Sequence, residues 1–262
     1  MGKLDLRGRH LVIIVTYVNQ SVTANGRLLY KAPPNLESAF YLFFERFLPI
    51  IAGRDDLQVV VIDNCSDQKI VEYLKNIRQP NILLQLLPAN IGKARAANDF
   101  LADNLDPQAL PRTIWSIDPD ILFDRMSFDY LAEAVENLPG VGMLGMRYRK
   151  NNCNPEIYVF LPPRNLVGRN GKNYSVSSPF MANVAGGIFA VSGEHLASPL
   201  NFRLFPMKEY LCYGPDDSTL YLYLKKHGLT SGYLNGALAT HLQSDVKVAP
   251  ELAKYMLGKK PN

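Results

Sequence analysis

The sequence is poor in cysteine and has no long apolar run, and both absences exclude broad classes of protein. Its three cysteines, Cys65, Cys153 and Cys212, are too few and too scattered for a disulfide framework, and none lies in a C-x-x-C pair that would hold zinc. No stretch approaches the ~18 uninterrupted apolar residues of a membrane span. No basic tip followed by an apolar core begins the chain. We therefore expect no transmembrane segment, no secretory leader and a cytoplasmic location.

A strong charge of one sign is also missing. The sequence carries 28 basic and 24 acidic residues, so its net charge of +4 is too small to require a nucleic-acid partner. The 262 residues have an ordinary hydrophobic content of 47% and are numerous enough to bury a core. No linker-like segment or internal repeat interrupts the chain, which predicts one domain over 1–262 with lobes at 1–120 and 121–262.

Apolar, β-branched runs alternate with amphipathic segments through the first lobe. These patterns predict strands over 10–17, 57–63, 82–87 and 113–117 and helices over 35–52, 67–77 and 92–104. Strand and helix units in this order predict an α/β protein with a mostly parallel central sheet flanked by helices. In such sheets ligands bind beyond the carboxyl ends of the strands. Tyr17, Asp63, Asn90 and Asp118 lie at or just after those ends, so we expect polar groups to gather there.

The second lobe is less regular. We expect helices over 127–138 and 216–226 and strands over 141–147, 157–161, 186–191, 230–234 and 237–240. The polar segment 162–180 is rich in glycine and asparagine, and we expect it to be a mobile loop that orders when a ligand binds.

Asp118-Pro119-Asp120 places two carboxylates directly after a predicted buried strand. Pro119 has a fixed φ and biases Asp118 toward an extended conformation, which stiffens the spacing of the two acids. Paired oxygen ligands suit Mg²⁺ or Mn²⁺, and Mg²⁺ commonly shares its coordination shell with substrate phosphates. The competing interpretation is a surface turn, because Asp-Pro-Asp also favours turns.

Asp63 ends another predicted strand, where its carboxylate can accept hydrogen bonds from a nucleobase or a ribose. Ser66 and Asp67, which follow it, are explained as caps of the next helix. After the third strand, Lys93 and Arg95 open a helix at the end that favours anions. A solvated basic turn explains the same two residues without a ligand.

Asp216 and Asp217 precede an amphipathic stretch, and His241 follows a short apolar strand. One of the two carboxylates would serve as general base for an acceptor hydroxyl, with a pKa raised by its neighbour. Acids are also favourable at a helix start, which explains the pair without catalysis. His241 would complete a metal site through an imidazole nitrogen, although a lone histidine is more often a packed or surface residue.

Six short motifs, in this order along the chain, resemble the family 2 glycosyltransferases with the GT-A fold. They are V-V-V-I-D-N-C-S-D (59–67), N-I-G-K-A-R-A-A-N (90–98), I-W-S-I-D-P-D (114–120), G-G-I-F-A-V-S-G (186–193), G-P-D-D-S-T-L (214–220) and His241. The resemblance spans most of the chain. It implies a GT-A fold whose first lobe binds a nucleotide-sugar and whose second lobe holds the acceptor.

The resemblance also implies a role for each candidate residue. Tyr17 and Asp63 would hold the nucleobase, and Asn90, Lys93 and Arg95 would lie against the nucleotide. Asp118 would reach the ribose or the metal, and Asp120 and His241 would ligate the metal of this DXD motif. Gly186 and Gly187 would line the sugar and acceptor cleft, and Asp217, supported by Asp216, would be the general base. The implied reaction is a metal-dependent displacement with inversion, and UDP is favoured because it is the commonest donor among relatives. The implied acceptor is a glycan or a lipid-linked molecule in polysaccharide or glycoconjugate synthesis.

The chain departs from the family pattern at some positions. Thr219 stands where many relatives have an acid, Ala97 stands where many have arginine, and no arginine-rich motif of processive polymerases follows Leu220, which favours a non-processive enzyme. Lys254, Lys259 and Lys260 form a basic tail that would contact an anionic membrane surface, or that is simply solvated.

Two other functions use the same residues. A phosphatase of the haloacid-dehalogenase type would use Asp118 as nucleophile and Asp120 as acid, but Leu122 stands where that motif has threonine or valine, and the motif normally lies near the N-terminus. A non-catalytic sugar-binding relative would need neither acid pair nor His241, and the chain has all of them.

Overall fold

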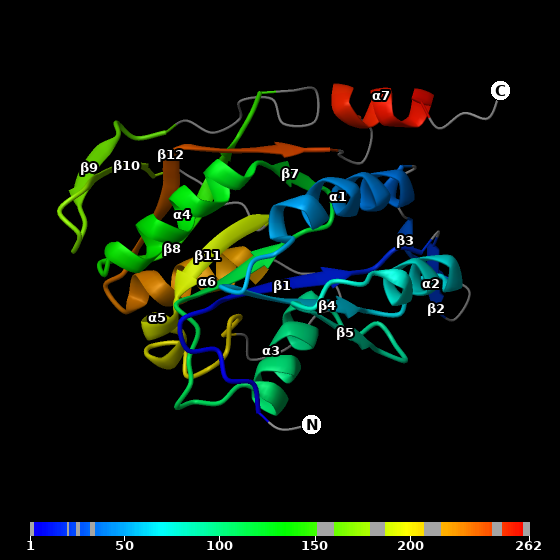
Figure 1. Cartoon of the computed structure of the whole chain (residues 1–262), viewed down its shortest axis with the longest axis horizontal. Coiled ribbons are helices and arrows are strands. Elements are labelled where there is room, and N and C mark those ends of the chain that lie inside the picture. The colour runs from blue at the N-terminus through cyan, green and yellow to red at the C-terminus, as the bar shows by residue number, and fades with distance from the viewer. Residues whose placement is uncertain are drawn as a thin grey trace.

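The structure is a computed structural model that describes residues 3–19, 21–24, 27–31, 35–150, 160–178, 187–206, 216–242 and 248–258. A ten-stranded sheet runs through its centre (Figure 1). From edge to edge its strands are β5 (Ile82–Leu86), β4 (Leu57–Asp63), β1 (His10–Thr16), β6 (Thr113–Ile117), β11 (Ile188–Ser192), β8 (Val141–Tyr148), β12 (Thr230–His241), β10 (Asn173–Ser177) and β9 (Arg164–Val167). Short β7 (Ile121–Phe123) pairs with β12, and β2 (Ser21–Ala24) and β3 (Arg27–Lys31) form a separate hairpin.

The predicted strands and helices of the first lobe are confirmed. β5, β4, β1 and β6 are all parallel, and β1 is buried at every position. The connecting helices α1 (Leu36–Ile51), α2 (Gln68–Asn76) and α3 (Lys93–Asn104) end within a residue of their predicted bounds. Gly53 follows α1 with a φ of +68°, the left-handed conformation that glycine adopts readily after a helix.

Helices cover both faces of the sheet (Figure 1). α1, α2 and α4 (Arg125–Asn137) pack on the face that carries Val59 and Val61 of β4. α3, α5 (Gly193–Ala197) and α6 (Asp216–Lys226) pack on the face that carries Val60 and Ile62. Because both faces are covered, β4 is apolar without alternation, as buried parallel strands are. This arrangement confirms the predicted α/β class.

The second lobe adds strands that run in both directions. β11 lies antiparallel between β6 and β8, and β12 runs parallel to β8. The two strands expected over 230–234 and 237–240 are one strand, β12, with a register shift between Leu234 and Leu238. Gly236 lies in this irregularity with a φ of +96°, which explains why the apolar pattern is interrupted there.

The expectation of a mobile loop over 162–180 is wrong in its described part, because β9 and β10 form an antiparallel hairpin there. Tyr174 and Val176 are buried on one side of β10, while Asn173 is exposed. The turn is closed by the Gly168 N–H, which donates to the Lys172 carbonyl at 2.8 Å. Because most residues of this segment are polar, the alternation of buried and exposed positions along β10 is not visible in the sequence. The strand expected over 157–161 begins outside the described residues, and Leu161 belongs to no strand.

Besides the β2–β3 and β9–β10 hairpins, three described elements were not predicted: β7, α5 and α7 (Pro250–Gly258). α7 packs on α1, and Leu252 of α7 shares one buried apolar cluster with Ala39 and Leu42 of α1. Among the helices of the described residues, none combines the length and the apolarity needed to cross a bilayer.

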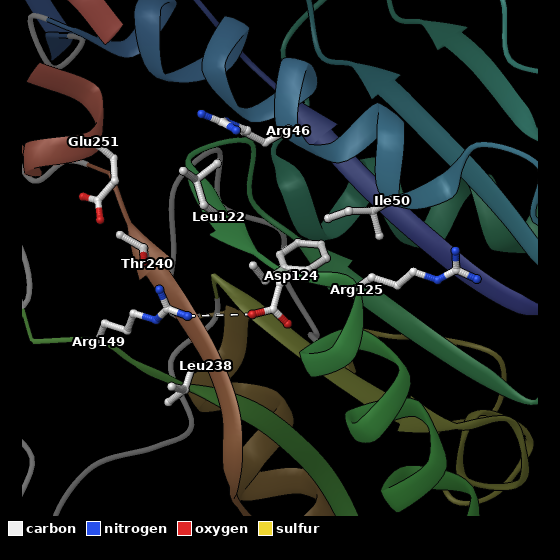
Figure 2. Close-up of a pocket in the computed structure, with 10 residues that line it drawn as sticks. Arg46, Ile50, Leu122, Asp124, Arg125, Arg149, Leu238, Thr240 and Glu251 are labelled. Carbon is white, nitrogen blue, oxygen red and sulfur yellow. Dashed lines mark ion pairs between the residues drawn. The ribbon is translucent and has the colours of Figure 1, made fainter. Parts of the chain in front are cut away.

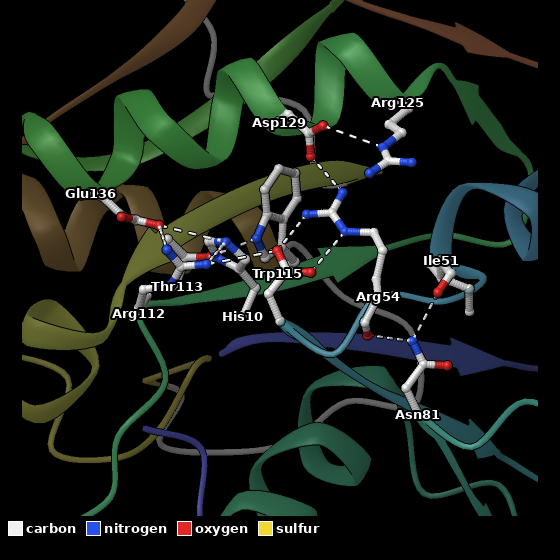
Figure 3. Close-up of polar contacts among 11 residues, drawn as sticks. His10, Ile51, Arg54, Asn81, Arg112, Thr113, Trp115, Arg125, Asp129 and Glu136 are labelled. Atoms are coloured by element: carbon white, nitrogen blue, oxygen red, sulfur yellow. Dashed lines mark hydrogen bonds and ion pairs between the residues drawn. The ribbon is translucent and has the colours of Figure 1, made fainter. Parts of the chain in front are cut away.

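A polar network lies at the amino ends of β1 and β6, the edge opposite to the predicted ligand site (Figure 3). The Oγ1 atom of Thr113 lies 2.8 Å from Nδ1 of His10 and accepts a hydrogen bond from Trp115 Nε1 at 2.7 Å. The Arg112 guanidinium lies 2.7 Å from Nε2 of His10. Because arginine only donates, Nε2 is the acceptor, and the imidazole is neutral with its proton on Nδ1.

Candidate functional site

Asp120 and His241 meet at the carboxyl edge of the sheet. After β6 the chain turns at Asp118-Pro119-Asp120 into β7, and β7 pairs with β12 so that Ile121 lies opposite His241. The Leu242 N–H donates to the Asp120 carbonyl at 2.9 Å and holds the two strands together at this point. As a result Oδ2 of Asp120 lies 3.2 Å from Nε2 of His241. Both side chains stay partly exposed, Asp120 at 18% and His241 at 33%.

Asp118 is paired with Lys93. Its Oδ1 lies 2.5 Å from Nζ of Lys93, the first residue of α3. The Lys93 ammonium also lies 6.0 Å from the centre of the Phe205 ring, which is a cation–π distance. Lys93 was predicted to face the nucleotide and Asp118 to face the ribose or the metal, and the structure places the two side by side.

Burial and the charges of neighbouring side chains shift the pKa values of Asp118 and His241. Burial raises the pKa of Asp118, an effect that Lys93 opposes and Asp120 reinforces. Burial lowers the pKa of His241, but the hydrogen bond that His241 donates to Asp120 and the charges of Asp120 and Asp118 outweigh it and leave that pKa above its ordinary value. The two carboxylates therefore favour the protonated imidazole more than water does.

The residues present fit a divalent cation only in part. Asp120 and His241 offer a carboxylate oxygen and an imidazole nitrogen, a donor pair that Mn²⁺ accepts and that leaves positions for diphosphate oxygens and water. Within the described ranges no group of three or more His, Cys, Asp or Glu side chains is placed to hold a metal ion. The third predicted ligand, Asp118, is engaged by Lys93.

Asn64 joins the two predicted nucleotide-binding turns, and we did not predict its role. Its side chain is buried, donates from Nδ2 to Oδ1 of Asn90 at 2.7 Å and accepts from the Ile91 N–H at 2.9 Å. The same Asn90 oxygen accepts from the Gly92 N–H at 3.0 Å. The amino end of α3 is thus fixed to the end of β4. The position of Asn64 directly after Asp63, at a strand end, was the available signal.

Asp63 holds the turn after β4 in place through two hydrogen bonds. It is 1% exposed, its Oδ1 accepts from the Thr16 hydroxyl at 3.1 Å, and its Oδ2 accepts from the Ser66 N–H at 3.1 Å. The expected capping of α2 by Ser66 or Asp67 is wrong. Asp67 makes no side-chain cap, and the Ser66 hydroxyl accepts from the Val18 N–H at 2.8 Å, because the β1 turn lies closer than the helix end.

Gly187 lies against Tyr148, a second residue that sequence reasoning missed. The Gly187 carbonyl accepts from the Asp118 N–H at 2.7 Å. A Cβ at position 187 would come within 2.5 Å of the Tyr148 hydroxyl, and the Tyr148 ring lies 5.9 Å from the His241 ring. Glycine therefore lets the Tyr148 phenol reach the Asp118–His241 region. Gly186 lies outside the described residues.

The remaining candidates are not joined to this group. Tyr17 follows β1 and is half-buried. Arg95 is exposed on α3, where its Nε lies 3.3 Å from Oδ2 of Asp99. Asp217 accepts from the Ser218 N–H at 2.8 Å and has no hydrogen bond or ion pair with Asp118, Asp120 or His241. The backbone of Asp216 begins α6, and its side chain lies outside the described residues.

A cleft of about 330 Å³ lies on the other side of β12 (Figure 2). Thr240 and Leu238 line it, and because neighbouring strand residues face opposite sides, His241 faces away from it. Arg149 on its rim lies 3.7 Å from Asp124. This cleft is therefore separate from the Asp120–His241 pair.

Comparisons with known proteins concern the fold. No family model matches the sequence, and no curated protein matches it. The mannosyltransferase PcManGT from Pyrobaculum calidifontis, in complex with GDP-Man and Mn²⁺, has a TM-score of 0.57 at 19% identity, over 94% of this chain and 60% of that chain. GalNAc-T7 with UDP, GalNAc and Mn²⁺ has a TM-score of 0.53 at 12% identity, over 95% and 47%. S. aureus TarS 1-349 has a TM-score of 0.50 at 16% identity, over 88% and 60%.

These structures are GT-A-type glycosyltransferases, and the likeness confirms the predicted GT-A fold of this chain. The chain spans 60% of PcManGT and 47% of GalNAc-T7, so it corresponds to part of each of those proteins.

Proposed function

We propose that the chain is a glycosyltransferase that moves a sugar from a nucleotide-diphospho-sugar, with UDP favoured, to an acceptor hydroxyl with inversion. One observation carries the proposal. Lys93, Asp118, Asp120 and His241 come from three distant stretches and meet at the carboxyl edge of the sheet. They do so in the fold of a mannosyltransferase solved with GDP-Man and Mn²⁺.

The donor would lie across the turns after β4 and β5. Asn64 and Asn90 fix the amino end of α3, whose first backbone N–H groups suit a diphosphate. Lys93 adds a positive charge at that end. Asp63 is occupied by Thr16 and Ser66, so we assign it to shaping the turn on which the base rests, with Tyr17 beside that turn.

Asp120 and His241 would hold a divalent cation, and Asp118 would complete its surroundings or bind the ribose. When bound, such a cation offsets the negative charge that develops on the departing diphosphate. The Lys93 ammonium, which lies beside Asp118, would contribute to the same charge balance. A ligating imidazole has to be neutral, so a cation at His241 would compete with a proton that the neighbouring carboxylates favour.

Asp217 is the proposed base. It would take the proton of the acceptor hydroxyl as that oxygen forms a bond to the anomeric carbon, while the bond from that carbon to the diphosphate oxygen breaks on the opposite face. Gly187 would line the sugar, since it leaves the space beside Tyr148 without a side chain. Asp216 would support Asp217 at the start of α6.

A thermal-shift screen of nucleoside diphosphates with and without Mn²⁺ tests donor binding, because a ligand of the folded state raises the unfolding temperature. A mass-spectrometric assay of matched nucleotide-sugars with glycan and lipid-linked acceptors then tests transfer. Stabilisation by a nucleoside diphosphate in Mn²⁺ together with a glycosylated product is the expected result. Release of phosphate from small phosphomonoesters without nucleotide binding would instead indicate the phosphatase, and sugar binding without product would indicate a non-catalytic protein.

A further inference from the structure

A cavity of about 680 Å³ lies among α1, α2 and α7, and it shares no lining residue with the proposed donor site. Its walls include Tyr41 and Glu45 of α1, Tyr73 of α2, and Tyr255 and Met256 of α7. Three aromatic rings from three helices thus border one space, and no step of the proposed transfer uses them.

Two of the three rings, those of Tyr41 and Tyr73, are packed against each other. The centroids of Tyr41 and Tyr73 lie 5.0 Å apart, and the two planes cross at 75°. The fully buried Phe40 packs behind both, at 5.4 Å from Tyr41 and 5.6 Å from Tyr73. Two rings at this angle form a corner, which surrounds a compact group better than it supports a flat one.

The cavity is electronegative. Glu37 on its wall is neutralised by an ion pair with Lys69. Glu45 is exposed and forms no hydrogen bond or ion pair with any described residue. Burial raises the pKa of Tyr73, and the neighbouring Tyr255 and Glu45 raise it further. The free carboxylate and the phenols therefore act together on the same space.

We propose that this cavity binds an alkylated ammonium group of the choline type. The faces of aromatic rings attract such a cation within about 6 Å, and several rings around it replace the water that it loses. Glu45 supplies the opposing charge. A bare metal ion fits less well, because the described residues hold no group of three or more His, Cys, Asp or Glu side chains placed to bind one. A methylated ammonium instead needs apolar and aromatic walls such as Met256 and the three tyrosines.

Isothermal titration calorimetry of the full chain with choline tests the proposal, and 3,3-dimethylbutan-1-ol serves as a neutral molecule of the same shape. We expect saturable binding of choline and none of the alcohol. Tyr255→Leu should weaken choline binding by roughly tenfold, whereas Tyr255→Phe should retain it, because the ring face makes the interaction. Glu45→Gln should weaken choline binding. Glu251→Gln should not, because Glu251 also belongs to α7 but lines the cleft beside Thr240 and Arg149.

Equal binding of choline and the alcohol, or no saturable binding of choline, would overturn the proposal. So would loss of binding in Tyr255→Phe together with an unchanged Glu45→Gln. Flotation with vesicles of phosphatidylcholine, compared with vesicles of phosphatidylglycerol, distinguishes a lipid headgroup from a free small molecule as the source of the ammonium. These measurements do not depend on glycosyl transfer, so failure of one proposal leaves the other intact.

Discussion

Protonation of His10 should destabilise the fold, and the size of the effect follows from the network at the amino ends of β1 and β6. The His10 side chain is 4% exposed. Its Nε2 accepts from Arg112 and its Nδ1 donates to Thr113, so an added proton would face a guanidinium at 2.7 Å. Burial, reinforced by the charge of Arg112, lowers the pKa of His10 from 6.5 to about 4.

The sign follows from which state binds the proton. The pKa of His10 is lower in the folded state than in the unfolded state, so the unfolded chain binds more protons below pH 6.5. Stability from the neutral imidazole is fully present above that pH and is lost as the pH falls toward 4. At ~1.4 kcal/mol per pKa unit the loss amounts to about 3 kcal/mol.

Urea denaturation of the wild type and of His10→Gln, at pH values from 4 to 7.5, measures this contribution. Other carboxylates titrate in both proteins, so the difference in unfolding free energy between them isolates His10. That difference should shift by about 3 kcal/mol in favour of the wild type as the pH rises from 4 to 7.5. A difference that stays constant over this range would refute the assignment of a buried neutral histidine.

Three further predictions concern the proposed site. Asp217→Asn should abolish transfer in the mass-spectrometric assay while leaving the affinity for a nucleoside diphosphate nearly unchanged, and residual turnover with weakened binding would count against its role as base. Gly187→Ala should lower the unfolding free energy by about 1–3 kcal/mol through overpacking against Tyr148. Adding Tyr148→Phe should recover part of this loss, since the added Cβ would meet the Tyr148 hydroxyl. Equal thermal denaturation of the wild type, the single variant and the double variant would contradict the close approach of Gly187 to Tyr148. Lys93→Met should weaken nucleoside diphosphate binding by about tenfold, as expected for loss of a charged hydrogen bond of about 1.5 kcal/mol. The same substitution should move the NMR titration of the Asp118 carboxyl to higher pH, because Lys93 lowers the pKa of Asp118. An unmoved titration would show that the Lys93–Asp118 ion pair is absent in solution.

The parallel strands of the first lobe could be predicted almost completely because β1, β4 and β6 are buried on both faces, and the edge strand β5 is still largely apolar. β4 has no polar residue at its sheet positions apart from Gln58 and the terminal Asp63, so its apolar run identifies a covered parallel strand. The β9–β10 hairpin could not be predicted, because only two of the buried residues of β10, Tyr174 and Val176, are apolar and their neighbours are polar. α7 was missed because its apolar side is matched to the outer side of α1, a contact that only the tertiary structure shows.

Within the candidate site, the sequence indicated residue types but not partners. The chain direction places Asp118 and Asp120 at a strand end, yet the Asp120–His241 contact depends on β7, a strand of three residues too short for any periodic signal. The pairing of Asp118 with Lys93 likewise depends on the angle at which α3 leaves β5. Asn64 acts through hydrogen bonds to the turn after β5, and Tyr148 packs against Gly187; no spacing in the sequence reports such contacts.

Anomalous diffraction at the manganese edge, from crystals grown with UDP and Mn²⁺, tests the central claim most directly. We expect an anomalous peak bonded to Asp120 and His241, with the diphosphate between that peak and the amino end of α3. A diphosphate bound in the Arg149 cleft on the far side of β12, or a manganese ion bonded to neither Asp120 nor His241, would contradict it.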